Sequence, residues 1–128
     1  MLGYVTIGAR DSEASGKFYD AVLGAVGDER KFADNGWIGW GPKDGGPDSY
    51  YCFVCPPHNG EPATFGNGSM LAFKAVSKED VDAAHAAGLA NGGSDEGKPG
   101  FRPPDGKEFY GAYLRDPTGN KLCVYFKS

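Results

Sequence analysis

The two halves of this 128-residue sequence match each other when one is shifted along the other by about 66 residues. The matched positions are Tyr4 with Met70, Ile7 with Phe73, Asp11 with Ser77, Leu23 with Leu89, and Gly27 with Gly93. No gap is needed to keep these pairs in register. The chain is therefore predicted to contain two copies of one small structural unit, each about half its length.

Each copy is predicted to begin with a strand followed by a helix. Residues 3–9 alternate in polarity and are rich in β-branched residues, which is typical of a strand. Asp11 then provides a helix N-cap. The second copy repeats this order, with a predicted strand over 69–76 and an N-cap at Ser77. The first helix is expected to end at Gly24–Gly27 and the second at Asn91–Gly93.

Further strands follow each predicted helix. In the first copy they are expected at 28–32, 36–41 and 49–55. In the second copy a hairpin of 108–114 and 121–126 is expected. The intervening residues 94–106 are dominated by glycine and proline, and the local pattern assigns no element to them.

Composition narrows the classes of function. A net charge of −4 argues against a nucleic-acid partner, because phosphate binding requires a basic face. No apolar run approaches the roughly 20 residues that a membrane-spanning helix needs, and no signal peptide is visible. Three cysteines are an odd number with no disulfide pattern, so we expect a reduced, cytoplasmic protein with no membrane association.

Three segments resemble a known superfamily. Tyr4–Asp11 with Leu23-Gly24 is similar to the first module of vicinal oxygen chelate proteins (the glyoxalase/bleomycin resistance protein/dioxygenase superfamily), Met70–Phe73 to the start of the second, and Arg115–Leu122 to the closing turn. The resemblance implies one α+β domain over 1–128. Two tandem βαβββ modules, at about 1–57 and 68–128, would form a curled, cup-shaped mixed sheet with helices on its convex side.

The resemblance also implies where metal ligands would lie. In metal-using members, His, Gln or Glu side chains come from the first and last strands of each module. Those positions fall on Tyr4, Met70, Cys123 and, within one residue, Cys52. None offers an imidazole, amide or carboxylate, the ligands that Mg²⁺, Mn²⁺, Ni²⁺ or Fe²⁺ would take here. We therefore predict no metal and no cofactor, although two thiols and a thioether could suit Cu(I) or Zn²⁺.

Other reactive side chains have plain structural explanations. Cys52 and Cys55 lie three residues apart on one predicted strand and so face opposite sides of the sheet. His85 is expected to be partly exposed on a helix. His58 is expected to be solvated in a loop, with a role as a proton shuttle left open. Arg115 is expected to pair with the adjacent Asp116.

Aromatic residues concentrate on the predicted strands, and about half of them should face the concave side. There they would line a cavity suited to a flat or apolar ligand, or pack against a partner subunit. Arg102 follows a glycine-rich segment and could clamp a carboxylate or phosphate. The candidate cavity residues are Tyr4, Trp40, Cys52, Met70, Arg102, Tyr110 and Cys123.

These observations favour a metal-free protein that binds a small aromatic or hydrophobic molecule in the cup. A metal-dependent lyase or dioxygenase of the glyoxalase type is one alternative, and a protein-interaction module with a filled cup is another. The resemblance is compatible with an enzyme and with a protein that catalyses nothing. It also implies a homodimer, because relatives commonly form two-fold dimers. No sequence feature identifies the ligand.

Overall fold

The computed structural model describes all 128 residues, and it contains the predicted repeat. Module 1 comprises β1 (Val5–Gly8), α1 (Ser12–Ala25), β2 (Asp28–Asp34), β3 (Trp37–Pro42) and β4 (Cys52–Cys55). Module 2 comprises β5 (Leu71–Lys74), α2 (Lys78–Ala90), β6 (Ser94–Phe101), β7 (Phe109–Arg115) and β8 (Lys121–Lys127). Strands β1 and β5 are offset by 66 residues, as are β2 and β6 at their first residues, which confirms two βαβββ units.

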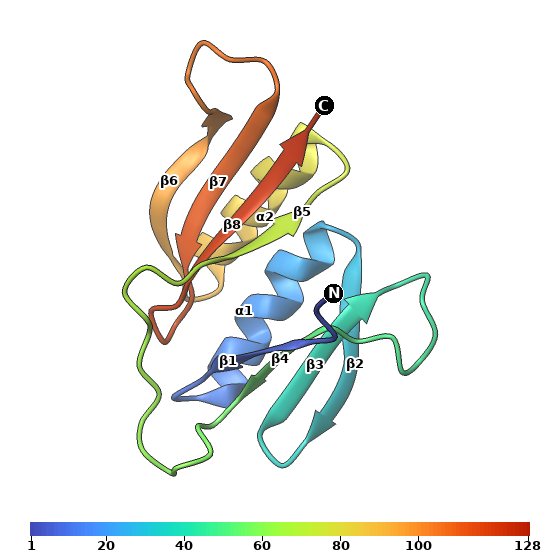
Figure 1. Cartoon of the computed structure of the whole chain (residues 1–128), viewed down its shortest axis with the longest axis vertical. Helices are drawn as coiled ribbons and strands as arrows, with labels where there is room; N and C mark the ends of the chain where they lie inside the picture. The colour runs from blue at the N-terminus through green and yellow to red at the C-terminus, as the bar shows by residue number, and fades with distance from the viewer.

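Each module forms one four-stranded mixed sheet. The strand orders are β1-β4-β3-β2 and β5-β8-β7-β6, and in both sheets the first pair is parallel and the others are antiparallel. The two sheets lie side by side with β1 and β5 nearest the middle, and both helices lie behind them (Figure 1). The sheets do not close into a barrel. Because both helices lie on one side, the other broad sheet face carries no helix.

Local signals in the sequence account for the start of each helix and for the first hairpin. Asp11 accepts a hydrogen bond from the backbone N–H of Ala14, and Ser77 accepts one from that of Asp80. The turn between β2 and β3 has positive φ angles of 52° at Asn35 and 83° at Gly36. Asn and Gly tolerate this conformation, so the turn forms without strain.

One apolar core joins the two modules on the helical side of the sheets. It contains 18 buried residues drawn from both sheets and both helices. Helices α1 and α2 pack against each other. Gly88 of α2 permits this approach, because a Cβ at that position would lie 3.2 Å from the side chains of both Phe18 and Val22 on α1.

Two local predictions are wrong, and one strand was left unassigned by the local pattern. Ser94–Phe101 forms β6 despite its glycines and proline, because it is an edge strand whose register with β7 is interrupted on both sides of Gly97. His85 is buried rather than partly exposed, with its Nε2 atom 2.8 Å from Asp95 Oδ1. Arg115 pairs with Glu96 at 2.7 Å and not with Asp116.

No helix has the length and apolar character needed to cross a membrane.

Candidate functional site

The helix-free face of the two sheets is the candidate site, and we call it the open face. Side chains alternate along each strand between the core and this face. On β4, Cys52 and Val54 belong to the 18-residue core, whereas Phe53 is buried but not part of it. On β8, Leu122 and Val124 belong to that core, whereas Cys123 is buried but not part of it.

Register shows which residues of the two modules are equivalent. Thr6 of β1 pairs with Phe53, and Ala72 of β5 pairs with Cys123. Because Thr6 and Ala72 are related by the 66-residue shift, Phe53 is the counterpart of Cys123. The last-strand position of module 1 on the open face is therefore Phe53, one residue from Cys52 and within the range that the sequence allowed.

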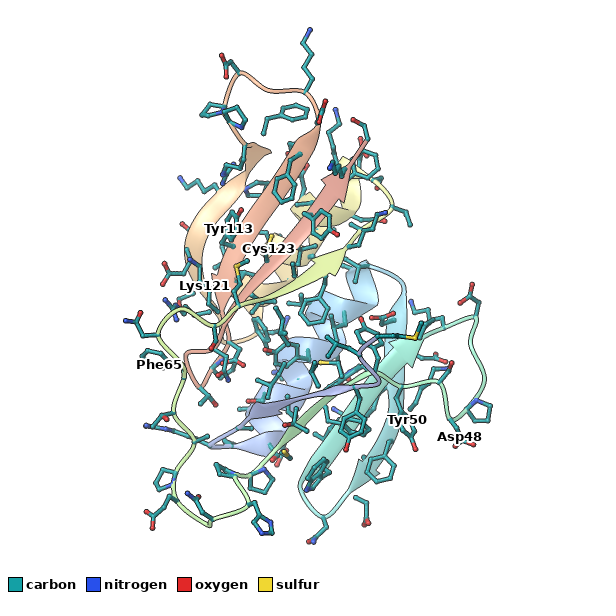
Figure 2. All side chains as sticks on the ribbon, in the orientation of Figure 1. Asp48, Tyr50, Phe65, Tyr113, Lys121 and Cys123 are labelled. Carbon is teal, nitrogen blue, oxygen red and sulfur yellow. The ribbon has the colours of Figure 1, made fainter.

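Phe53 is the centre of an aromatic cluster on the module 1 half of the open face. Four rings surround it edge-on at centroid distances of 5.1–6.1 Å: Tyr50, Tyr4, Trp37 and Phe32. Tyr50 is labelled in Figure 2. The cluster lines an open cavity of about 450 Å³. The lining residues are Tyr4, Phe32, Asp34, Asn35, Trp37, Tyr50 and Phe53.

Glycines on the same or a neighbouring strand make room for rings that lie across the open face. A Cβ at Gly39 of β3 would lie 2.7 Å from the Phe53 ring. In module 2, a Cβ at Gly97 would lie 2.8 Å from the Tyr113 ring, and one at Gly111 would lie 2.7 Å from the Phe109 ring. Part of the high glycine content therefore keeps aromatic rings flat against the sheet.

A second cavity lies along the seam between the modules. Strands β1 and β5 are not hydrogen-bonded to each other. The space beside them, about 620 Å³, is lined by both strands, by Tyr19 of α1 and by linker residues 64–69 with 120–122 of the closing turn and β8. Its lining includes the hydroxyl groups of Thr6, Thr64 and Ser69 and the ammonium group of Lys121.

The module 2 half of the open face carries positive charge. Tyr113 of β7 and Cys123 of β8 are directly opposite each other in register. Figure 2 shows both near Lys121. Burial raises the pKa of the Cys123 thiol, although a hydrogen bond with Tyr113 and the charges of Arg102 and Lys121 act in the opposite direction. The thiol is therefore protonated at neutral pH.

The structure divides the seven predicted cavity residues into two groups. Tyr4, Met70, Arg102 and Cys123 lie on or beside the open face. Trp40, Cys52 and Tyr110 face the helices: Trp40 donates its indole N–H to Asp20, and the Tyr110 hydroxyl donates to Asp82 of α2.

The cysteines and the loop histidine do not form a reactive set. Cys52 and Cys55 are both buried but face opposite sides of β4, with Cys52 towards the 18-residue core, and all three thiols are free. Burial raises the pKa of Cys52 to about 12. His58 is exposed and shares a shallow cavity of about 460 Å³ with Cys55. Burial also raises the pKa of the Cys55 thiol, so it is not activated as a nucleophile.

The residues at the expected ligand positions do not fit a divalent metal ion. Tyr4 packs on the Phe53 ring, Phe53 has no donor atom, and Met70 offers only a thioether. No three side chains among His, Cys, Asp and Glu are grouped so that they could hold a metal ion. Arg102 and Lys121 also place positive charge near Cys123. The chemistry of this donor set therefore disagrees with that of the metal-using relatives.

Sequence reasoning alone did not single out Phe53, Tyr113 and Lys121 as site residues. Phe53 could have been found by combining two available signals, the alternation along its strand and the 66-residue repeat. Lys121 and Arg102 are 19 positions apart in the sequence, on either side of a strand. Only the pairing of β7 with both β6 and β8 brings Arg102 and Lys121 near Tyr113.

Comparison with known proteins identifies the family. The Glyoxalase/Bleomycin resistance protein/Dioxygenase superfamily matches residues 1–124. A glyoxalase/bleomycin resistance protein from Albidiferax ferrireducens T118 is 44% identical, covers 99% of both chains and superposes with a TM-score of 0.86. This chain therefore belongs to the Glyoxalase/Bleomycin resistance protein/Dioxygenase superfamily.

More distant structures show the same fold. A glyoxalase-related enzyme from Fulvimarina pelagi is 21% identical over 99% of this chain and 88% of its own, with a TM-score of 0.75. A lactoylglutathione lyase from Agrobacterium tumefaciens is also 21% identical, over 98% and 92%, with a TM-score of 0.65. A comparison with curated proteins gives no significant match.

Proposed function

We propose that this protein binds a small aromatic or hydrophobic molecule on its open face and that it does so without a metal ion. The observation that carries the proposal is the Phe53 cluster. An apolar ring system occupies one of the positions at which metal-using relatives carry a ligand side chain, and it lines a cavity of about 450 Å³. Pockets of this size lined mainly by aromatic side chains suit drug-sized apolar ligands.

The exposure of these rings supports binding rather than a purely structural role. Tyr4 is 62% exposed and Trp37 is 38% exposed. Ring faces that remain in contact with water gain free energy when an apolar ligand covers them, at about 25 cal/mol per Å² of buried apolar surface. The cavity is open, so the arrangement favours a ligand site over a cup filled by its own side chains.

The test is fluorescence titration with N-phenyl-1-naphthylamine, a neutral aromatic probe. Wild-type protein should bind it and enhance its emission, and Trp37→Leu should weaken binding roughly tenfold by removing part of the cavity wall. Leu89→Ala is the matched control, because Leu89 is an exposed apolar residue of α2, on the other side of the molecule. Failure of wild-type protein to bind, or equal binding by both variants, would contradict the proposal.

The metal-free part of the proposal has its own test, which also addresses a metal-dependent lyase or dioxygenase. Protein purified without an affinity tag should contain much less than one metal ion per chain by plasma mass spectrometry. Cys123→Ser should not change that content. Near-stoichiometric metal that is lost in Cys123→Ser would overturn the metal-free proposal and direct attention to glyoxalase and dioxygenase substrates.

A homodimer and a cytoplasmic location complete the proposal. Phe65 and Met70 are 52% and 44% exposed beside the seam, so a second copy could cover apolar surface there. Sedimentation velocity should give about twice the chain mass, and Met70→Glu should shift the distribution towards the monomer. A monomer at all concentrations would argue against the dimer. The three free thiols are compatible with a reducing compartment.

A further inference from the structure

Two positively charged side chains contact the same aromatic ring on the module 2 half of the open face. The Arg102 Cζ atom lies 5.6 Å from the centroid of the Tyr113 ring, and the Lys121 Nζ atom also lies 5.6 Å from it. The three side chains come from separate segments: Tyr113 from β7, Lys121 from the first residue of β8, and Arg102 from the segment that follows β6. The sheet therefore assembles this cluster from residues that are not adjacent in sequence.

Neither cation is neutralised by a carboxylate. The Arg102 guanidinium donates only to backbone carbonyl oxygens, at 2.7 Å to Lys98 and 3.4 Å to Phe101. Lys121 is half-buried, yet its ammonium group makes no hydrogen bond or ion pair within the protein. By contrast, Arg30 on β2 is held by both carboxylate oxygens of Asp20.

The acidic residues of β6 are already engaged elsewhere. Glu96 accepts a hydrogen bond from Arg115 at 2.7 Å. Asp95 points to the helical side, where its Oδ1 atom lies 2.8 Å from His85 Nε2. The positive charge at Arg102 and Lys121 is therefore not cancelled by either of these neighbours, and a bound anion would relieve the repulsion between the two cations.

The shape of the cluster indicates which anion fits it. A guanidinium group binds planar oxyanions through two parallel hydrogen bonds, and an ammonium group adds a flexible third donor. The Tyr113 ring, supported by Gly97 beneath it, provides a flat apolar surface next to both cations. A planar ring that carries a carboxylate would satisfy all three side chains, whereas inorganic phosphate would use only the two cations.

We propose that Arg102 and Lys121 bind the carboxylate of a small aromatic acid whose ring packs on Tyr113. This inference rests on the proposed function in taking the ligand to be aromatic, but it concerns a different part of the open face from the Phe53 cavity. Lys121 also lines the 620 Å³ seam cavity, which leaves room for a ligand larger than a single ring. Cys123, at a position where metal-using relatives carry a ligand side chain, would thus lie beside an anion site in this chain.

The experiment is a ¹H–¹⁵N NMR titration of the full chain with benzoate, with benzamide as the neutral analogue and inorganic phosphate as the anion without a ring. Benzoate should shift the amide signals of Gly97, Tyr113 and Lys121 in a saturable way. Arg102→Gln and Lys121→Gln should each weaken benzoate binding about tenfold, as expected for the loss of one charged hydrogen bond. Lys17→Gln, at an exposed position of α1, is the charge-matched control and should not change it.

The same spectra show whether each variant is folded, so loss of binding cannot be mistaken for loss of structure. Equal shifts with benzamide, or benzoate binding that is unaffected by both substitutions, would overturn the proposal. Tighter binding of phosphate than of benzoate would assign the cluster to a phosphate-bearing ligand and overturn the aromatic acid. Binding of N-phenyl-1-naphthylamine with no response to benzoate would leave the proposed function intact and reject this inference alone.

Discussion

The hydroxyl group of Tyr19, on α1 of module 1, donates a hydrogen bond to Oδ2 of Asp116, in the β7–β8 turn of module 2, across 2.8 Å. Both side chains are buried. The other oxygen of Asp116, Oδ1, accepts hydrogen bonds from three backbone N–H groups of the turn at 2.9 Å each. One carboxylate therefore shapes the turn and attaches it to the other module.

Two further contacts make this turn the joint between the modules. The Asn120 side-chain amide donates to the carbonyl oxygen of Gly8 at 2.9 Å, and the backbone N–H of Arg10 donates to Thr118 Oγ1 at 3.1 Å. The segment Arg115–Leu122, which resembles the closing turn of the superfamily, therefore positions β1 relative to β8.

Tyr19→Phe should lower the free energy of unfolding by about 1–3 kcal/mol, because it leaves a buried carboxylate oxygen with one partner fewer. The measurement is urea denaturation followed by circular dichroism. Tyr4→Phe is the matched control, since the Tyr4 side chain is exposed and makes no hydrogen bond through its hydroxyl. An equal effect of both substitutions would show that the Tyr19 contact contributes nothing.

Asp116→Ala should destabilise the protein more than Tyr19→Phe does, because it removes the acceptor for three turn amides as well as for the tyrosine. Asp116→Asn should destabilise the protein less than Asp116→Ala and more than Tyr19→Phe, because the amide oxygen can still accept hydrogen bonds from the turn. Thermal unfolding of the three variants gives the order directly. If Asp116→Ala were no worse than Tyr19→Phe, the turn amides would not depend on this side chain.

Stability should fall at alkaline pH. In the folded protein burial raises the pKa of Cys52 to about 12, whereas a thiol in the unfolded chain titrates near about 8.5. The pKa of Tyr19 is also raised well above its usual value, chiefly by burial and by the charge of Asp116. The folded state therefore holds protons that the unfolded state releases, so the stabilisation is complete below about pH 8 and is lost progressively above it.

Urea midpoints measured between pH 7 and pH 10 test this expectation. Cys52→Ala should reduce the loss of stability between about pH 8.5 and 9.5, where the thiol of the unfolded chain ionises. In the same range, Cys52 should react with a thiol reagent only as fast as the protein unfolds. Rapid labelling of Cys52 in the folded protein would contradict its assignment to the core.

The sequence predicted the fold more completely than it predicted the site. The repeat, the N-caps at Asp11 and Ser77 and the Asn35-Gly36 turn depend on near neighbours in the chain, so they could be read directly. The strand β6 was missed because its glycine and proline content is tolerated only at a sheet edge, which is a property of the assembled sheet.

Side-chain direction was the main limit on predicting the site. Trp40 and Cys52 lie on strands that border the open face, but alternation turns both towards the helices. A slip of one residue is enough to exchange Cys52 for Phe53, and only the register with β1 removes that uncertainty. The cluster of Arg102, Tyr113 and Lys121 depends on the pairing of three strands, which no local pattern specifies.

Two glycines near the ends of the helices, Gly24 and Gly88, differ in how closely other side chains surround them. Neither has a positive φ angle. A Cβ at Gly24 of α1 would meet nothing within 4 Å, so Gly24→Ala should stabilise the protein by about 0.5–1 kcal/mol through higher helix propensity. A Cβ at Gly88 of α2 would lie 2.8 Å from Cδ1 of the buried Leu114 and 3.2 Å from the side chains of Phe18 and Val22. Gly88→Ala should therefore cost about 1–3 kcal/mol despite the same gain in propensity. Denaturant unfolding of both variants tests the packing of α2 against β7 and α1, since stabilisation by both substitutions would mean that α2 packs less closely than the structure shows.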